Sequence, residues 1–189
     1  MGDPKKTRKK YQKPSHPWQR ERIEEERILM KDYALKNKRE LWKANSLLRD
    51  FKKQTKKLSG SQTEQSQIER INLIKKLQKY GLVHENAQID DILGLSIKNI
   101  LDRRLQTIIF KKGFAKTIGQ ARQFITHRHI IVDEKNIDAP GYIVPKDSEQ
   151  KITFKTKSAL ANADHPERVP KAPAAATNTV EPKKQEVSV

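Results

Sequence analysis

Residues 101–132 read LDRRLQTIIFKKGFAKTIGQARQFITHRHIIV, and this stretch decides the fold. Apolar residues recur at helical spacing from Ser96 to Gly113, which we expect to end a helix. Thr117 is a typical N-cap for a second helix, after which HIIVD and KITFK have the pattern of strands around an APGY turn. The sequence therefore predicts a helix-loop-helix and a small antiparallel sheet over residues 96–157.

A helical domain is expected before this unit, over residues 21–95. Neither Pro nor Gly occurs between Arg20 and Leu58, and apolar residues recur at helical spacing. This pattern suits one long helix or two helices, with a bend near Asn37 as one way to keep the domain compact. A further helix is predicted to end at Gly81.

The two ends of the chain differ from the middle in composition. Residues 1–20 carry many cations and three prolines, which predicts a flexible basic arm. Residues 158–189 hold four basic and four acidic residues and no aromatic, so we expect a disordered tail. The predicted fold class is therefore α+β, with four segments: the arm, the helical domain, the helix-loop-helix with its sheet, and the tail.

The charge balance argues for a polyanionic partner. The chain has 189 residues, with 40 Lys and Arg against 23 Asp and Glu, a net charge of +17. Because the tail is neutral, the excess of positive charge lies in residues 1–157. This placement favours nucleic-acid binding over the alternative that the charges only solvate the helix surfaces. Few aromatic residues are available as stacking platforms, so structured RNA fits better than single strands, although composition alone does not separate RNA from DNA.

Other chemistry is weakly indicated. His127 and His129 lack further ligands at metal-binding spacing, and Asp90 and Asp91 are better explained as helix-capping residues. With no cysteine, disulfides and thiolate zinc sites are excluded. Only 34% of the residues are hydrophobic, and no apolar run approaches a spanning helix of about 18 residues. We expect an intracellular protein with no catalytic residue, cofactor, metal, small-molecule substrate or membrane partner.

The stretch RRLQTIIFKKGFAKTIGQARQFITHRHIIVD, with APGYIV after it, closely resembles the S-four RNA-binding module. The start MGDPKKTRKKY with HPW, then YALKNKRELWKAN and QKYGLV, resembles the ribosomal S-four family of the small subunit in its archaeal and eukaryotic branch. The resemblance spans roughly residues 1–157. It implies direct binding to small-subunit rRNA in the cytoplasm, an early role in assembling the subunit body, and a place near the mRNA entry path beside the S-five family member.

The resemblance also implies which side chains contact RNA. In the module these are Arg103, Arg104, Lys111, Lys112, Lys116, Gln120, Arg122, His127, Arg128 and His129. In the arm and the long helical segment, the expected RNA contacts are Lys5, Lys6, Arg8, Lys9, Lys10, Arg20, Lys38, Arg39, Lys43, Lys52 and Lys53. Trp18 and Trp42 are expected to pack the arm onto the helix, with stacking on a base as the alternative.

Four positions depart from the family pattern. Many members read HGHI and VNG where this chain has Arg128 and the pair Asp133 and Glu134, so the Gly of each tight turn is missing. Gly141 stands where the related turn usually has Ser. Arg128 and Glu134 therefore stand where a tight turn beside the sheet would favour Gly.

Three alternative functions remain. A ribosome-assembly factor of the same fold would bind pre-rRNA and leave the mature subunit. An RNA-modifying enzyme with such a module as an appendage would need a catalytic domain, for which the rest of the chain is too short and too polar. A DNA-binding protein is disfavoured because no recognition helix is identifiable.

Overall fold

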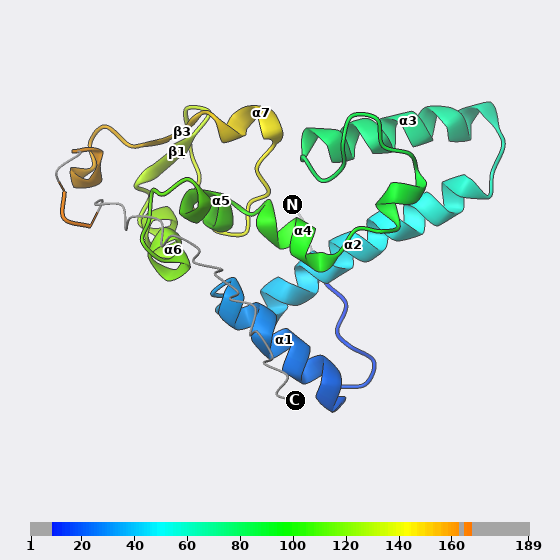
Figure 1. Ribbon diagram of the computed structural model, residues 1–189, viewed down its shortest axis with the longest axis horizontal. Coiled ribbons are helices and arrows are strands. Elements are labelled where there is room, and N and C mark those ends of the chain that lie inside the picture. Colours follow the sequence, from blue (N-terminus) through cyan, green and yellow to red (C-terminus); the bar gives the residue numbers. More distant parts are fainter. Residues whose placement is uncertain (1–8, 163–164, 168–189) are drawn as a thin grey trace, which may run out of the picture.

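The computed structural model describes residues 9–162 and 165–167. The expected basic-arm residues Lys5, Lys6 and Arg8 lie outside this part, as does most of the expected tail. Two cores divide the described chain, one in the helical half up to Leu101 and one from Leu105 onward. The predicted α+β class is confirmed by helices throughout and one small sheet (Figure 1).

The helical half is built around one long helix. Its elements are α1 (Arg20–Asp32), α2 (Lys38–Ser59), α3 (Glu64–Lys79), a 3-10 turn at Asp90–Ile92 and α4 (Ile97–Asp102). Leu41, Leu48 and Phe51 of α2 are buried together with Leu77 of α3 and Ile100 of α4. In Figure 1, α2 runs diagonally from the middle of the molecule toward the right, and α3 turns back from its far end.

The predicted bend near Asn37 is a complete break between α1 and α2. Ala34 has a left-handed φ of 44°, and the N–H of Leu35 donates to the carbonyl of Met30 at 2.9 Å. This is the hydrogen bond of a Schellman motif, with buried Leu35 as its apolar anchor. The helix therefore ends without a Gly or Pro, because burial of Leu35 holds the strained residue before it.

The second half contains α5 (Leu105–Lys111), α6 (Ile118–Thr126), β1 (Ile130–Val132), β2 (Lys135–Asn136), α7 (Lys146–Glu149), β3 (Ile152–Phe154) and a 3-10 turn at Ala159–Ala161. The three strands form an antiparallel sheet in the order β2-β1-β3. Helices α5 and α6 pack on one side of it, with Ile109, Ile125 and Ile130 fully buried between them. The predicted helix-loop-helix and sheet are confirmed.

One prediction for this half was wrong. The helical stretch expected from Ser96 to Gly113 is two helices, because Arg104 is extended at φ −71° and ψ 143°. There the backbone pairs with the chain after the APGY turn: the N–H of Leu105 donates to Tyr142 O at 2.7 Å, and that of Val144 donates to Arg103 O at 3.1 Å. These long-range hydrogen bonds replace the local helical ones.

The predicted ends of several helices are confirmed. Gly81 and Gly113 have left-handed φ values of 64° and 75° just after α3 and α5. The hydroxyl of Thr117 accepts a hydrogen bond from the N–H of Gln120 at 3.1 Å, as an N-cap should. Gly113 and Thr117 thus mark the two ends of the loop between α5 and α6.

The positions that lack the family's glycines keep the backbone that a glycine would allow. Arg128 follows α6 with a left-handed φ of 60°, and Asp133 and Glu134 turn between β1 and β2 with φ values of 51° and 65°. Gly141 has no left-handed φ, and a Cβ there would lie 3.5 Å from Nη2 of Arg104, so a Ser would fit. The sheet geometry is thus retained at the cost of backbone strain.

Packing continues past the expected boundary at Lys157. Leu160 is only 5% exposed and packs in the same core as Phe154. The hydroxyl of Ser158 caps the 3-10 turn by accepting from the N–H of Leu160. The segment beginning at Ser158, expected to be disordered, is therefore packed at its start.

Candidate nucleic-acid interface

The two halves are joined by an ion-pair cluster around Glu40 in the first turn of α2, hereafter the Glu40 bridge. Nη2 of Arg104 donates to Glu40 Oε2 at 2.6 Å. Arg122 of α6 donates from Nη2 to Oε1 at 2.8 Å and from Nη1 to Oε2 at 3.2 Å. The sequence reasoning missed Glu40, since an acid in a first helical turn is common and gives no sign of partners elsewhere.

The Glu40 bridge is electrostatically strong. Burial by itself raises the pKa of Glu40, but the hydrogen bonds and charges of Arg122 and Arg104 outweigh it, so the pKa lies below 4.5. Arg104 is 5% exposed and Arg122 is partly buried. Two of the arginines expected to contact phosphates are therefore engaged in ion pairs within the protein.

Arg103 is also engaged within the protein. Its Nη1 donates to Oε2 of Glu149 in α7 at 2.8 Å, and its Nη2 donates to Val144 O at 3.0 Å. Its side chain lies against Gly81, where a Cβ would come within 3.3 Å of the guanidinium carbon. Arg103 thus fastens α7 to the end of α3, and its accessibility to RNA is small.

The end of α5 and the loop that follows it carry three exposed lysines. Lys111, Lys112 and Lys116 are all exposed. Lys111 pairs with Asp102 at 3.1 Å in a solvent-exposed contact, and Nζ of Lys112 donates to Glu149 O. Because an exposed ion pair is weak, Lys111 can exchange its contact with Asp102 for another anion at little cost.

The described residues Pro166 and Glu167 lie against the start of α6. Nζ of Lys116 donates to Pro166 O at 2.6 Å, and Nε2 of Gln120 donates to Glu167 O at 3.4 Å. Oε1 of Gln120 accepts from the N–H of Lys116 at 2.7 Å. Lys116 and Gln120 are therefore brought together, and they already contact protein carbonyls.

His127, Arg128 and His129 are grouped at the end of α6. The two imidazole rings stack with centroids 6.1 Å apart and an angle of 7° between them. Nδ1 of His129 lies 2.8 Å from Oγ of Ser158, and exposed Arg128 pairs with Asp138 at 3.2 Å. No group of three or more potential metal ligands occurs in the described part of the chain.

The expected RNA contacts in the helical half are spread over several faces. Arg20 pairs with Glu24 in α1 at 2.8 Å, and Lys38 pairs with Glu26 at 3.1 Å. Lys9, Lys10, Arg39, Lys43 and Lys53 are exposed, Lys52 is partly buried, and none of these six forms an ion pair with a residue that the structure describes. The unpaired cations therefore lie both where the arm meets α2, as Arg39 and Lys43 do, and further along that helix, as Lys52 and Lys53 do.

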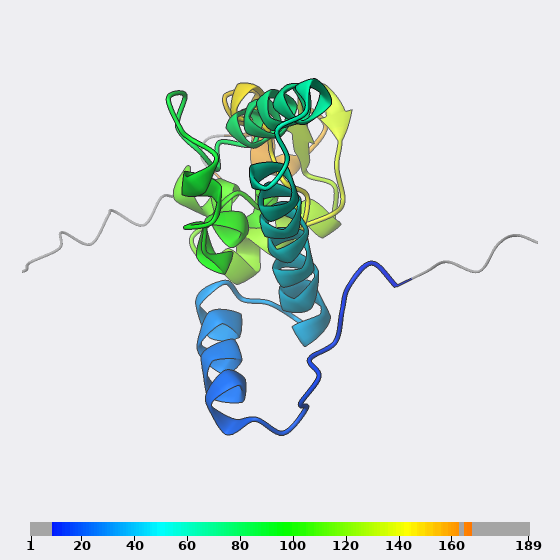
Figure 2. The same ribbon diagram turned by 90° about the vertical axis from the view of Figure 1, so that its right-hand side faces the viewer.

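The arm passes back beside the first turns of α2 (Figure 2). The N–H of Gln12 donates to Oγ of Ser46 at 2.9 Å, and Arg22 of α1 donates to the carbonyls of His16 and Pro17. The arm residues that the structure describes are thus tied to α1 and α2.

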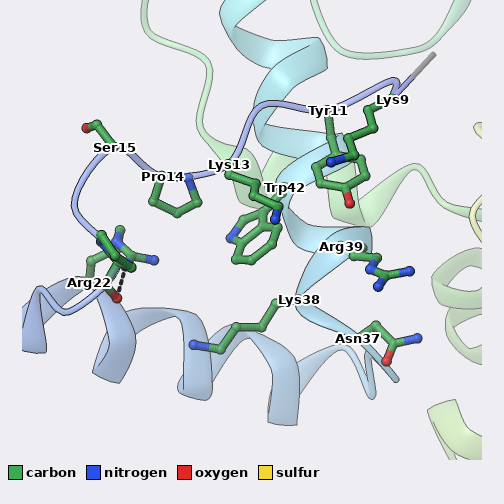
Figure 3. Close-up of a pocket in the computed structure, with 11 residues that line it drawn as sticks. Lys9, Tyr11, Lys13, Pro14, Ser15, Arg22, Asn37, Lys38, Arg39 and Trp42 are labelled. Atoms are coloured by element: carbon green, nitrogen blue, oxygen red, sulfur yellow. Dashed lines mark hydrogen bonds between the residues drawn. The ribbon is translucent and has the colours of Figure 1, made fainter.

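A groove remains between the arm, α1 and α2 (Figure 3). Tyr11 and Trp42 face each other there with ring centroids 6.1 Å apart, which bears out the expected packing of Trp42 against the arm. Trp18, in contrast, is 89% exposed and does not pack as expected. The expectation missed Tyr11 and Lys13 as groove residues, because their proximity to Trp42 depends on how the arm folds back.

Across residues 9–162 and 165–167, no helix has both the length and the hydropathy required to span a membrane.

Comparison with known proteins gives one consistent family. A model of the S4 domain matches residues 103–149. The small ribosomal subunit protein uS4 of Methanococcus aeolicus is 47% identical over 169 residues, covering 89% of this chain and 96% of that protein. The uS4 protein of Nanoarchaeum equitans is 48% identical over 163 residues, covering 85% and 91%, and that of Ignicoccus hospitalis is 46% identical over 154 residues, covering 82% and 93%.

Proposed function

The chain belongs to the uS4 family of small ribosomal subunit proteins, and we propose that it is a structural component of that subunit which binds its rRNA directly. The relatives carry the name of the subunit and match nearly the whole of their own length. The S4 domain supplies the RNA-binding module. The function is therefore binding and scaffolding in translation, not catalysis.

The observation that carries the proposal is the placement of exposed cations on a rigid frame. The Glu40 bridge consumes Arg104 and Arg122, and so fixes the module against α2. The exposed loop lysines and the cations near the arm, Arg39 and Lys43, remain available for phosphates. Cations held rigidly at two separated places suit a folded RNA better than a flexible strand.

Affinity comes mainly from phosphate neutralisation and the release of counterions. With about six to ten phosphate contacts, affinity falls about 10³- to 10⁵-fold between 50 and 200 mM salt. The net charge of +17 also speeds association with a polyanion. Phosphate contacts set the position of the protein, while the shape of the RNA supplies selectivity.

We extend the proposal to the place of the protein in the cytoplasmic ribosome. The family resemblance supports early binding that nucleates the subunit body, contact with the S-five family member, and a position near the mRNA entry path. An assembly factor that leaves the mature subunit is not favoured, because the relatives are named as proteins of the subunit itself.

Filter binding of the full chain to small-subunit rRNA tests the proposal. We expect saturable binding to rRNA, with an association constant whose logarithm falls linearly with the logarithm of the salt concentration. Binding to a DNA duplex of equal length should be weaker. Equal affinity for both nucleic acids at every salt concentration would contradict a specific role with rRNA.

A further inference from the structure

We propose that the groove between the arm and the start of α2 holds one unpaired nucleotide of the bound RNA, with its base stacked on Trp42 and its phosphates near Lys13 and Arg39. This inference rests on the proposed RNA-binding function and adds a base-binding site to it. It also assigns to Trp42 the stacking on a base that the sequence left as the alternative role for the two tryptophans.

The groove has the size and lining of a nucleotide site. Its volume is about 1020 Å³, at the upper end of the range of about 300–1,000 Å³ that is usual for ligand sites. It is open on one side, and Figure 3 shows Tyr11, Lys13 and Trp42 around it, with Lys38 and Arg39 at the base of α2. A nucleotide that projects from a larger RNA requires such an open side.

Trp42 is fixed before any ligand arrives. Its Nε1–H donates to Oε1 of Glu26 at 3.1 Å, and Glu26 itself is buried in α1. The polar edge of the indole is therefore satisfied by protein, while its face borders the groove. A base stacking on that face would cost little reorganisation, which is the condition under which stacking yields affinity.

The ring of Tyr11 stands at an angle to Trp42 and does not cover its face. The ring planes of Tyr11 and Trp42 are inclined by 32°, so the two rings do not stack flat on each other. Tyr11 is held in place by the neighbouring contact between the Gln12 N–H and Ser46. The pair thus presents two aromatic surfaces to one opening, and both are only partly buried.

The charges around the groove favour an anionic ligand. Five cations line it, namely Lys9, Lys13, Arg22, Lys38 and Arg39, and no acid is among its lining residues. The carboxylate behind the groove is Glu26, which is paired with Arg22 at 2.5 Å and with Lys38 at 3.1 Å. Lys9, Lys13 and Arg39 have no ion-pair partner within the described residues, so they are free to bind phosphate.

The test uses the intrinsic fluorescence of Trp42. The chain has two tryptophans, and Trp18→Phe removes the exposed one and leaves Trp42 as the single reporter. The full-length Trp18→Phe protein is titrated with an oligoadenylate hexamer, with the hexamer in which all bases are removed, and with AMP. We expect saturable quenching by the hexamer, and roughly 5- to 150-fold weaker binding of the abasic hexamer, the loss expected for one stacked base.

Two variants separate stacking from packing of the arm. Trp42→Phe and Trp42→Leu are made in the full chain, and binding of the hexamer is measured by its own fluorescent label. Trp42→Phe keeps a ring and is expected to retain most of the affinity, whereas Trp42→Leu is expected to lose it. Equal affinities of the Phe and Leu variants would overturn the stacking role.

The remaining outcomes are distinguishable from failure of the proposed function. Binding of full-length rRNA with no quenching by the hexamer would overturn the base site and leave the rRNA-binding role intact. Quenching by AMP at the same concentrations as by the hexamer would assign the groove to free nucleotides. It would overturn the proposal that the bound nucleotide is part of an RNA chain. Absence of binding to both hexamer and rRNA would overturn both proposals.

Discussion

Arg104 and Glu40 lie 64 positions apart in the sequence and meet through a 2.6 Å ion pair that joins the S4 module to the helical half. Arg122 completes the contact from α6. Because Arg104 is almost fully buried, this contact is not an exposed surface ion pair. The same residue type that would bind phosphate on a surface here fixes the orientation of one basic surface relative to the other.

Glu40→Gln is expected to lower the free energy of unfolding by about 2–4 kcal/mol, because two partly or fully buried guanidinium groups lose their counter-charge. Urea unfolding followed by circular dichroism measures the change. The matched control is Glu25→Gln, which removes an exposed carboxylate of α1 and should cost less than about 0.5 kcal/mol. Equal stability of the two variants would show that the Glu40 bridge is energetically unimportant.

The Glu40 bridge should also shape the acid stability of the protein. The pKa of Glu40 is lower in the folded protein than its ordinary value of 4.5. Between the folded pKa and the ordinary pKa, the unfolded chain therefore binds more protons than the folded protein. The stabilisation is therefore present above about pH 4.5 and is lost as the pH falls through the folded pKa. Unfolding of the wild type and Glu40→Gln, compared between about pH 6 and pH 3, should show a shallower loss in the variant. An identical pH slope would contradict this assignment.

Reversal of exposed loop charges should weaken RNA binding without unfolding the protein. Lys111→Glu with Lys112→Glu leaves the cores untouched, and we expect the salt slope of rRNA binding to fall by about one for each lost phosphate contact. Lys75→Glu with Lys79→Glu makes the same charge change on exposed positions of α3, which are not among the expected contacts. An equal loss of affinity in both double variants would mean that only net charge matters.

Reversal of Arg104 is a different experiment from reversal of the loop lysines. A carboxylate at position 104 would face Glu40 in a largely buried site, so the expected result is unfolding. Residues of the same charge thus separate into buried and exposed groups, a distinction that the sequence does not reveal.

Arg128→Gly should stabilise the protein by about 1 kcal/mol. Arg128 holds a left-handed φ of 60° at the end of α6, a conformation that costs a residue with a Cβ about 1–2 kcal/mol and costs Gly little. Its exposed ion pair with Asp138 contributes little in return. A rise of about 2–4 °C in Tm by calorimetry is expected.

The control for this prediction is Gln123→Gly, an exposed position inside α6, which should destabilise by about 0.5–1 kcal/mol. A lower Tm for Arg128→Gly would show that the side chain of Arg128 does more for the fold than its strained backbone costs.

Local features of the fold were predictable because their causes are local. Gly81, Gly113 and Thr117 act on backbone groups within one helical turn, and the sequence placed all three correctly. The interruption at Arg104 was not predictable, since the hydrogen bonds that cause it come from the chain around Tyr142. Helical periodicity continues across the break and carries no trace of it.

The candidate site was predictable to a similar degree. Composition and charge pointed to a polyanion, but they did not distinguish Arg104, which is buried, from Lys111, which is exposed. The meeting of Tyr11 and Trp42 depends on the path of the arm over α2, which a sequence read without relatives does not specify. The family resemblance indicated the function, whereas the structure shows which cations are buried in ion pairs and which are exposed.

Sedimentation of a lysate from cells that express the chain tests the central claim most directly. Gradient fractions are probed for the protein in moderate and then in high salt. We expect near-stoichiometric amounts in mature small subunits and translating ribosomes, retained through the high-salt wash by contacts to rRNA. Restriction to pre-ribosomal fractions, or absence from every ribosomal particle, would contradict the role as a structural component of the small subunit.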